Sequence, residues 1–271
     1  RMVAIKSGDE YRYYDPAIPY LPPGMLDWYE QGQPALIADP KEPKLILLPA
    51  TPAEVSSTRR VAMLKLAEDG SVSGNVSMEF FGHLAVSEKT RLDEQSEGSR
   101  EEGMKKRFEA RYPGAKITNL KLENPKLPHG PLGLSFDISM ENFAQRTGKR
   151  MFFEAAFFQS GEKPLFSAPA RRYPISFRHA YSEFDEIRLE FPSTFTLDNA
   201  EMPGTMKLGE VGSYSLTASV SNVSPVISIQ RKFVWGQKGG LYFEPKNYGA
   251  VKKVWDMIHS YNTHTLTLKV K

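Results

Sequence analysis

Alternation of apolar and polar residues is the clearest pattern in this chain. Val72, Val76 and Met78 alternate with polar or small residues, which places one set of side chains on a buried sheet face. A second apolar stretch lies at residues 60–67, and the polar segment 68–71 between the two contains an Asp-Gly turn signal, so a β-hairpin is predicted. Comparable patterns predict further strands at residues 2–5, 11–14, 45–48, 115–122, 132–140, 150–158, 175–177, 186–191, 212–220, 226–235 and 265–270.

Two segments have helical periodicity instead. Ser99 and Glu102 match a capping box, in which two side chains satisfy backbone donors at a helix start. Apolar residues then recur every four positions at Met104, Phe108 and Tyr112, until a Pro-Gly pair ends the predicted helix. Apolar spacing over residues 251–258 predicts a second helix near the C-terminus.

A proline-rich segment follows the first predicted hairpin. Five prolines lie between Pro16 and Pro34, and they deny backbone donors to a strand ladder. We therefore expect an extended connection that wraps a neighbouring surface. The side chains expected to fix it there are Tyr20, Leu21, Met25, Leu26 and Trp28.

The strand-rich remainder predicts a mainly β, α+β chain. Three prolines and an Arg-Arg pair in residues 164–174 mark the best candidate boundary. We expect two β-sandwich-like domains with one helix each, at 44–170 and 171–271, preceded by a short N-terminal segment at 1–43.

Composition narrows the function classes. The net charge of +3 comes from 35 basic and 32 acidic residues, without the concentrated basic face that nucleic-acid binding needs. No apolar run is long enough to span a bilayer. The chain has no cysteine, which excludes disulfides and thiol nucleophiles within it. Arg1 is compatible with a mature or excised piece, because translation starts at methionine.

Asp15 has the most distinctive neighbourhood of any candidate site residue. An Asp before a Pro commonly starts a turn, because its carboxylate accepts bonds from nearby backbone. The functional interpretation is a carboxylate that orients a catalytic histidine in a nucleophile–base–acid triad.

The residues around Asp15 carry a resemblance. The run Tyr13-Tyr14-Asp15-Pro16, followed by Pro19-Tyr20-Leu21-Pro22 and Gly24-Met25-Leu26, resembles the end of the core in bacterial transglutaminase-like proteins. In that family a cysteine-peptidase-like core is flanked by domains of unknown function, and the aspartate before the proline completes a Cys-His-Asp triad. The resemblance extends loosely over nearly the whole chain, but only residues 11–27 carry a moderately specific pattern.

The resemblance implies an accessory role rather than catalysis by this chain. Ala17 replaces a usual threonine, and all five histidines lie after Asp15, so the chain alone cannot perform thiol chemistry. We expect residues 1 to about 40 to be the trailing edge of the core, and the rest to be the C-terminal accessory region of a secreted or periplasmic protein. Its expected partners are the upstream core and a peptide or protein substrate.

Two alternatives come from other classes. An independent carbohydrate-binding β-sandwich module would use exposed aromatic residues, for which the candidates are Trp28, Tyr29, Trp235 and Tyr242. A carboxylate-based hydrolase would use two residues of the acidic set Glu183, Asp185, Glu186 and Glu190. Clustered acids on one strand are more typical of solvated charge that protects a sheet edge.

Overall fold

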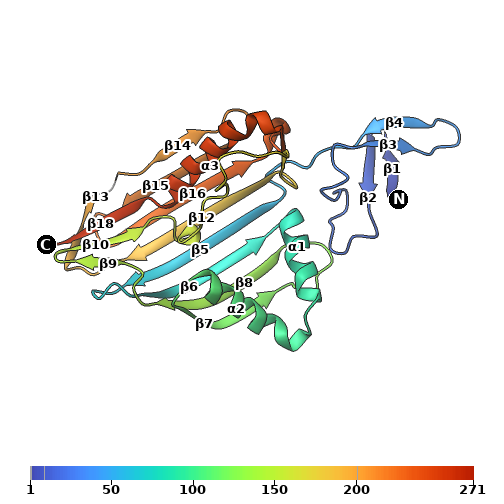
Figure 1. Ribbon diagram of the computed structural model, residues 1–271. Helices are drawn as coiled ribbons and strands as arrows, with labels where there is room; N and C mark the ends of the chain where they lie inside the picture. Colours follow the sequence, from blue (N-terminus) through green and yellow to red (C-terminus); the bar gives the residue numbers. More distant parts are fainter. Residues whose placement is uncertain (1, 9, 200) are drawn as a thin grey trace.

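A computed structural model describes residues 2–8, 10–199 and 201–271. The protein is mainly β with an α+β composition, and its centre is an eight-stranded mixed sheet (Figure 1). In spatial order the strands are β14 (Gly204–Lys207), β15 (Gly212–Val220), β16 (Val226–Trp235), β12 (Tyr181–Glu190), β5 (Ser57–Leu66), β6 (Val72–Phe80), β8 (Leu132–Met140) and β7 (Ala115–Glu123).

The two central strands join the two halves of the chain. β5 and β12 are parallel and pair from Ser57 opposite Ser182 to Lys65 opposite Glu190. Every other neighbouring pair in this sheet is antiparallel. The predicted domains 44–170 and 171–271 therefore contribute strands to the same sheet and share one core. The prediction of two β-sandwich-like units is not confirmed, because a parallel pair between distant segments leaves no signal in local periodicity.

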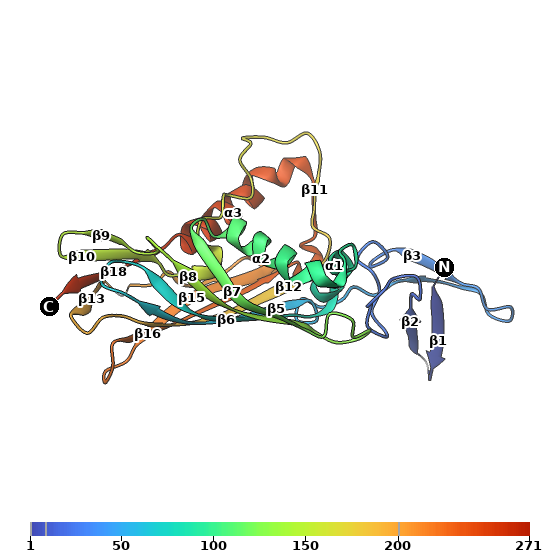
Figure 2. The same ribbon diagram turned by 90° about the horizontal axis from the view of Figure 1, so that it is seen from below.

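A second sheet and three α-helices lie on one face of the large sheet (Figure 2). The four-stranded sheet has the order β13 (Phe195–Asn199), β18 (Thr265–Val270), β10 (Arg150–Glu154) and β9 (Gln145–Thr147). The helices are α1 (Gly82–Asp93), α2 (Arg100–Arg111) and α3 (Tyr248–Asn262). A short pair of β11 (Ile175–Ser176) and β17 (Tyr242–Phe243) lies beside them, with 3₁₀ turns at Glu97–Ser99, Phe157–Gln159, Gln237–Gly239 and Pro245–Asn247.

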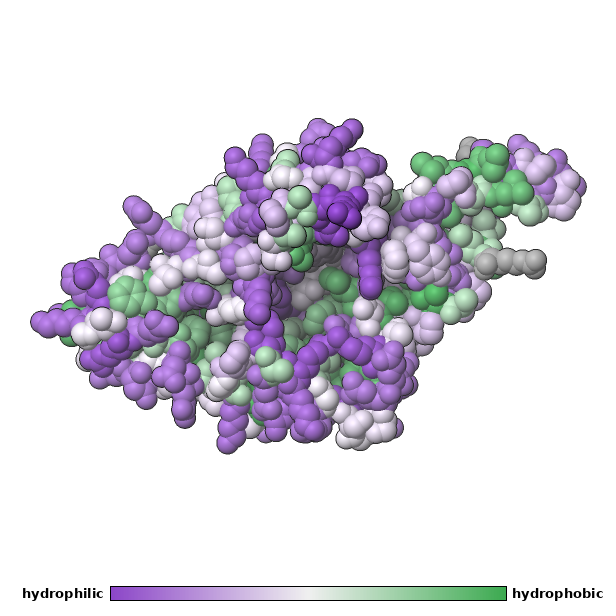
Figure 3. All heavy atoms as spheres, viewed as in Figure 1, coloured by the Kyte–Doolittle hydropathy of each residue, from purple (hydrophilic) through white to green (hydrophobic). Residues whose placement is uncertain are grey.

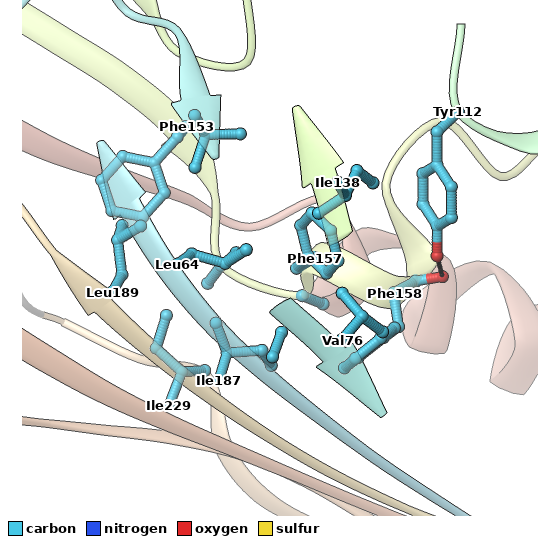
Figure 4. Close-up of a cluster of buried hydrophobic side chains, with 14 of the residues drawn as sticks. Leu64, Val76, Tyr112, Ile138, Phe153, Phe157, Phe158, Ile187, Leu189 and Ile229 are labelled. Carbon is cyan, nitrogen blue, oxygen red and sulfur yellow. Dashed lines mark hydrogen bonds between the residues drawn. The ribbon is translucent and has the colours of Figure 1, made fainter. Parts of the chain in front are cut away.

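One continuous hydrophobic core fills the space between these layers. Ile187 and Leu189 of β12 and Leu64 of β5 project from the large sheet, and Phe153 of β10 meets them from the second sheet (Figure 4). Phe157 packs in the same core. Such burial is worth roughly 1.5–3 kcal/mol for each large apolar side chain. The opposite face of the large sheet carries the alternate residues of each strand and is mostly exposed and polar.

The local predictions succeed for most strands and partly for the helices. β8, β15, β16 and β18 have the predicted bounds. Ser99 does precede α2, but its hydroxyl makes no cap to that helix and bonds instead to Ser96. Helix α1 was not predicted, because His83 and Lys89 occupy buried positions on it and interrupt the apolar stripe. None of the helices formed by the described residues is long and apolar enough to cross a bilayer.

Residues 2–8 and 10–50 form an arm that projects from the body formed by the later described residues (Figure 1). The arm contains two separate hairpins, and the second of them lies partly in the segment predicted as an extended connection. The predicted first hairpin is confirmed, although its turn includes Asp9, which lies outside the described residues. The strands are β1 (Val3–Ser7) with β2 (Glu10–Tyr14), and β3 (Pro34–Ile37) with β4 (Lys44–Leu47).

Candidate functional site

Asp15 stands where β2 ends and the proline-rich loop begins. Its Oδ1 accepts the backbone N–H of Ala17 at 2.9 Å, which is the local turn expected of an Asp before a Pro. The side chain is partly exposed, and no described histidine donates to it. The described residues therefore place a carboxylate on the arm surface, with one oxygen engaged in its own loop and the other without a hydrogen-bond partner among them.

The loop after Asp15 fastens the arm to helix α1, a surface that the sequence analysis left unidentified. Leu21 and Met25 are buried against Val86 of the helix. The Tyr20 hydroxyl donates to Asp93 Oδ2 at 2.5 Å, although Tyr20 adopts a positive φ of 64° that L-residues rarely use. Anchoring at several points gives the arm a defined base on the body.

His83 is the buried centre of this anchor. Its Nε2 lies 2.9 Å from both the carbonyl oxygen of Leu26 and the amide nitrogen of Gln31, and its Nδ1 lies 2.8 Å from the Ser56 hydroxyl. Burial and, to a smaller degree, the stacked His179 imidazole lower the pKa of His83 to about 4. Ser56 is completely buried and cannot act as a nucleophile here, so the pair serves to hold the arm.

The outer part of the arm exposes apolar side chains. Leu36, Leu45 and Leu47 are 62, 77 and 72 % exposed, and we call these three residues the leucine face. Between the two hairpins lies a cleft of about 680 Å³, lined by residues such as Tyr11, Tyr13 and Ile46. Figure 3 shows the apolar surface gathered on this part of the molecule. Contiguous exposed apolar surface of this kind marks an interaction site.

The acidic set on β12 is divided between the two faces of the large sheet. Glu186 and Glu190 lie on the exposed face, whereas Glu183 and Asp185 point into the body. β12 is a central strand, so the interpretation of Glu183 and Asp185 as solvated charges on a sheet edge is wrong. The alternation of side chains along a strand separates the four carboxylates that the sequence places together.

Glu183 and Asp185 form an ion cluster with Arg60 of β5 and Arg231 of β16. Arg60 donates to Asp185 Oδ1 at 2.6 Å and to Glu183 Oε2 at 3.0 Å. Arg231 donates to Glu183 Oε2 at 2.5 Å and to Asp185 Oδ2 at 3.2 Å. The charges balance, and Gln159 donates a further bond to Asp185 at 3.1 Å. The cluster thus ties the three central strands together on their buried face.

The ion cluster is poorly suited to hydrolysis. Burial alone would raise the pKa of Glu183, but the guanidinium groups of Arg60 and Arg231 outweigh it and lower the pKa to about 2. A general acid needs a carboxyl group that is still protonated near the working pH. Glu183 reaches a cavity of about 220 Å³ beside Tyr181, where it can act only as a hydrogen-bond acceptor.

The aromatic candidates do not gather on one surface. Trp235 is 1 % exposed and packs against Trp255 in the core, which contradicts its assignment as a sugar-contacting residue. Trp28 and Tyr29 are exposed neighbours on the arm, with the Arg178 guanidinium 5.4 Å above the Trp28 ring. Tyr242 is exposed on β17, in the body.

Arg60, Arg231 and His83 are functional-site residues that the sequence did not predict. Arg60 shares the buried face of β5 with Ala62 and Leu64, so the period-two pattern already placed a charged residue at a core position. A charge at such a position signals a buried partner. His83 gave no comparable signal, because its partners lie on the arm and on the segment before β5.

Comparisons with known proteins add no constraint. The chain matches no protein-family model, no curated protein and no solved structure. Among the described residues, no group of three or more His, Asp or Glu side chains could hold a metal ion.

Proposed function

We propose that this chain is the non-catalytic C-terminal accessory region of a secreted or periplasmic transglutaminase-like protein. In this proposal the arm docks on the upstream core, and the body helps to position a peptide or protein substrate there. The observation that carries the proposal is the leucine face, because its three leucines, in a paired hairpin, are left uncovered by the residues that the structure describes.

The position of Asp15 supports the same arrangement. It lies on the arm, and the loop that follows it is anchored to α1 through Tyr20 and Leu26. A core docked on the arm would therefore meet both an apolar surface and a partly exposed carboxylate. The anchor would hold the body at a fixed place beside that core, which suits a region that positions a substrate.

The test compares matched variants in the intact protein and in this chain alone. Leu45 and Leu47 are replaced together by aspartate, and Val223, which is 96 % exposed on the β15–β16 loop, is replaced by aspartate as the control. We expect the double variant to lower the thermal midpoint of the intact protein and to leave that of the chain unchanged, because only docking buries these leucines. Val223→Asp should change neither.

An intact protein that tolerates the double variant as well as it tolerates Val223→Asp would contradict docking through the leucine face. A midpoint that falls equally in the chain alone would show that these leucines stabilise the arm itself. Either result would remove the observation on which the proposal rests.

A further inference from the structure

Another cavity lies in the body, far along the chain from the arm. It has a volume of about 320 Å³ and is bounded by α3 and by residues 162–165. The segment that follows packs along α3, where Lys252 donates to the Phe166 carbonyl at 2.9 Å and Tyr248 donates to the Ala168 carbonyl at 2.6 Å. Figure 2 shows this segment arching beside the helix. The cavity thus lies between two elements that are fastened to each other and is open to solvent on one side.

Asn262 brings an unused donor to this cavity. The residue is 6 % exposed, and its Oδ1 accepts Arg231 Nε at 3.0 Å and the Tyr214 hydroxyl at 2.8 Å. Because a guanidinium can only donate, the oxygen must face Arg231, and the amide Nδ2 must be on the other side. Nδ2 has no hydrogen-bond partner among the described residues, and Asn262 lines the cavity. The amide Nδ2 is therefore a donor available to a ligand at the cavity wall.

Two further donors line the same cavity. His259 lies one turn before Asn262 on α3, and its imidazole has no hydrogen-bond partner among the described residues. Lys163 stands opposite on the loop and forms no salt bridge with the part of the chain that the structure describes. The acid beside it, Glu162, is already paired with Arg111 at 3.0 Å. The free groups therefore favour an anionic acceptor.

The remaining walls are mainly apolar, and the indole Nε1 of Trp255 is a buried donor without a hydrogen-bond partner among the described residues. Leu165, Trp255 and Ile258 complete the lining, so the cavity combines one cluster of donors with an apolar pocket. A single lysine suits a single negative charge, and Glu162 at the same wall disfavours an anion of higher charge. This combination matches a carboxylate attached to an apolar group.

We propose that this cavity binds a small monocarboxylate that carries an apolar group. Its carboxylate accepts from Asn262 Nδ2 and pairs with Lys163, and its apolar group packs against Leu165 and Trp255. Such a group occurs in a free carboxylic acid and at the C-terminus of a peptide that ends in an apolar residue. The site does not depend on docking of the arm, because all of its residues belong to the body.

The test is an NMR titration of the full chain with three probes. N-acetyl-leucine carries the carboxylate, N-acetyl-leucinamide lacks it, and an acetylated Ala-Ala-Leu peptide presents it at a chain end. We expect the first and third probes to shift the side-chain amide signals of Asn262 and the indole N–H signal of Trp255. Tighter binding of the peptide would support a peptide C-terminus as the source, and equal binding would support a free acid.

Matched variants locate the site. Asn262→Asp keeps the oxygen that accepts from Arg231 and replaces only the donor, and should weaken N-acetyl-leucine binding by about tenfold or more. Lys163→Gln alters an exposed side chain that pairs with no acid among the described residues, and should weaken binding by about threefold or more. Lys253→Gln, on the exposed side of α3, is the control and should change nothing.

The proposal is overturned if neither carboxylate probe shifts these signals at 20 mM, or if the amide probe binds equally well. It is also overturned if Lys163→Gln and Lys253→Gln have the same effect. A failure of the arm to dock would leave these results unchanged, since the two sites share no residue.

Discussion

Replacing Asp185 by alanine should be among the most destabilising changes in the body. Its carboxylate is completely buried and accepts from Arg60, Arg231 and Gln159. Without it, two buried guanidinium groups share Glu183 as the only carboxylate of the cluster. Removing one partner from a buried ionic group costs about 3–5 kcal/mol, a large part of the roughly 5–15 kcal/mol that stabilises a typical domain.

Urea unfolding followed by circular dichroism measures this cost. With a slope of about 3 kcal/mol per molar urea, the midpoint should fall by about 1–2 M. Glu186→Ala is the matched control, because the next residue on β12 points to the exposed face and should change stability by less than about 0.5 kcal/mol.

A charge-balanced double variant separates loss of a charge from loss of packing. Changing Arg60 to Met together with Asp185 to Leu leaves Arg231 paired with Glu183 and should recover most of the lost stability. The reasoning would be refuted if Asp185→Ala cost no more than Glu186→Ala, or if the double variant were less stable than Asp185→Ala.

Four other outcomes are expected. The free energy of unfolding should fall by up to about 3 kcal/mol as pH drops from 6.5 towards 4, because the unfolded chain protonates His83 and the folded anchor does not. Melting curves of wild type and His83→Gln at several pH values measure this effect. The same pH dependence in both proteins would contradict it. Below pH 4.5 the contribution of Glu183 to folding stability should be lost progressively as pH falls towards 2, since the pKa of Glu183 is lowered in the folded state. Acid unfolding curves of wild type and Glu183→Gln should therefore diverge in that range. Gly74→Ala should destabilise the protein by about 1–3 kcal/mol, because a Cβ would lie 2.1 Å from the Met63 carbonyl oxygen. Gly249→Ala, in open space on α3, should stabilise it by about 0.5–1 kcal/mol. Similar melting curves for the two variants would be inconsistent with this packing. In an intact protein with an active core, Asp15→Asn should lower the rate of the thiol reaction by about tenfold or more. Asp39→Asn, which alters a similar turn on the arm, is the control and should leave that rate unchanged. Equal reaction rates of the two variants would rule out a catalytic role for Asp15.

Local pattern predicted most of the strands because side-chain alternation is a local property. The hairpin of β5 and β6 and the bounds of β8, β15 and β16 all follow from apolar and polar residues within one segment. The parallel pairing of β5 with β12 brings together residues more than a hundred positions apart, and no local pattern encodes it. The predicted pair of β-sandwich-like units is not confirmed for this reason.

The same distinction applies to the candidate sites. Asp15 could be found from its neighbours in sequence, and its turn to Ala17 is local. The ion cluster and the donors around Asn262 are assembled from different elements, so the sequence shows only single residues of unexpected polarity. Arg231, between Ile229 and Phe233 on the buried face of β16, is the clearest example.

Hydrogen exchange of the arm in the intact protein tests the central claim most directly. The backbone amides of residues 34–47 should exchange at least about tenfold more slowly in the intact protein than in this chain alone, because docking would cover the leucine face and its hairpin. Amides of the body far from the arm, such as those of β15, should exchange at the same rate in both. Equal exchange of residues 34–47 in the two proteins would contradict an arm that docks on a transglutaminase-like core.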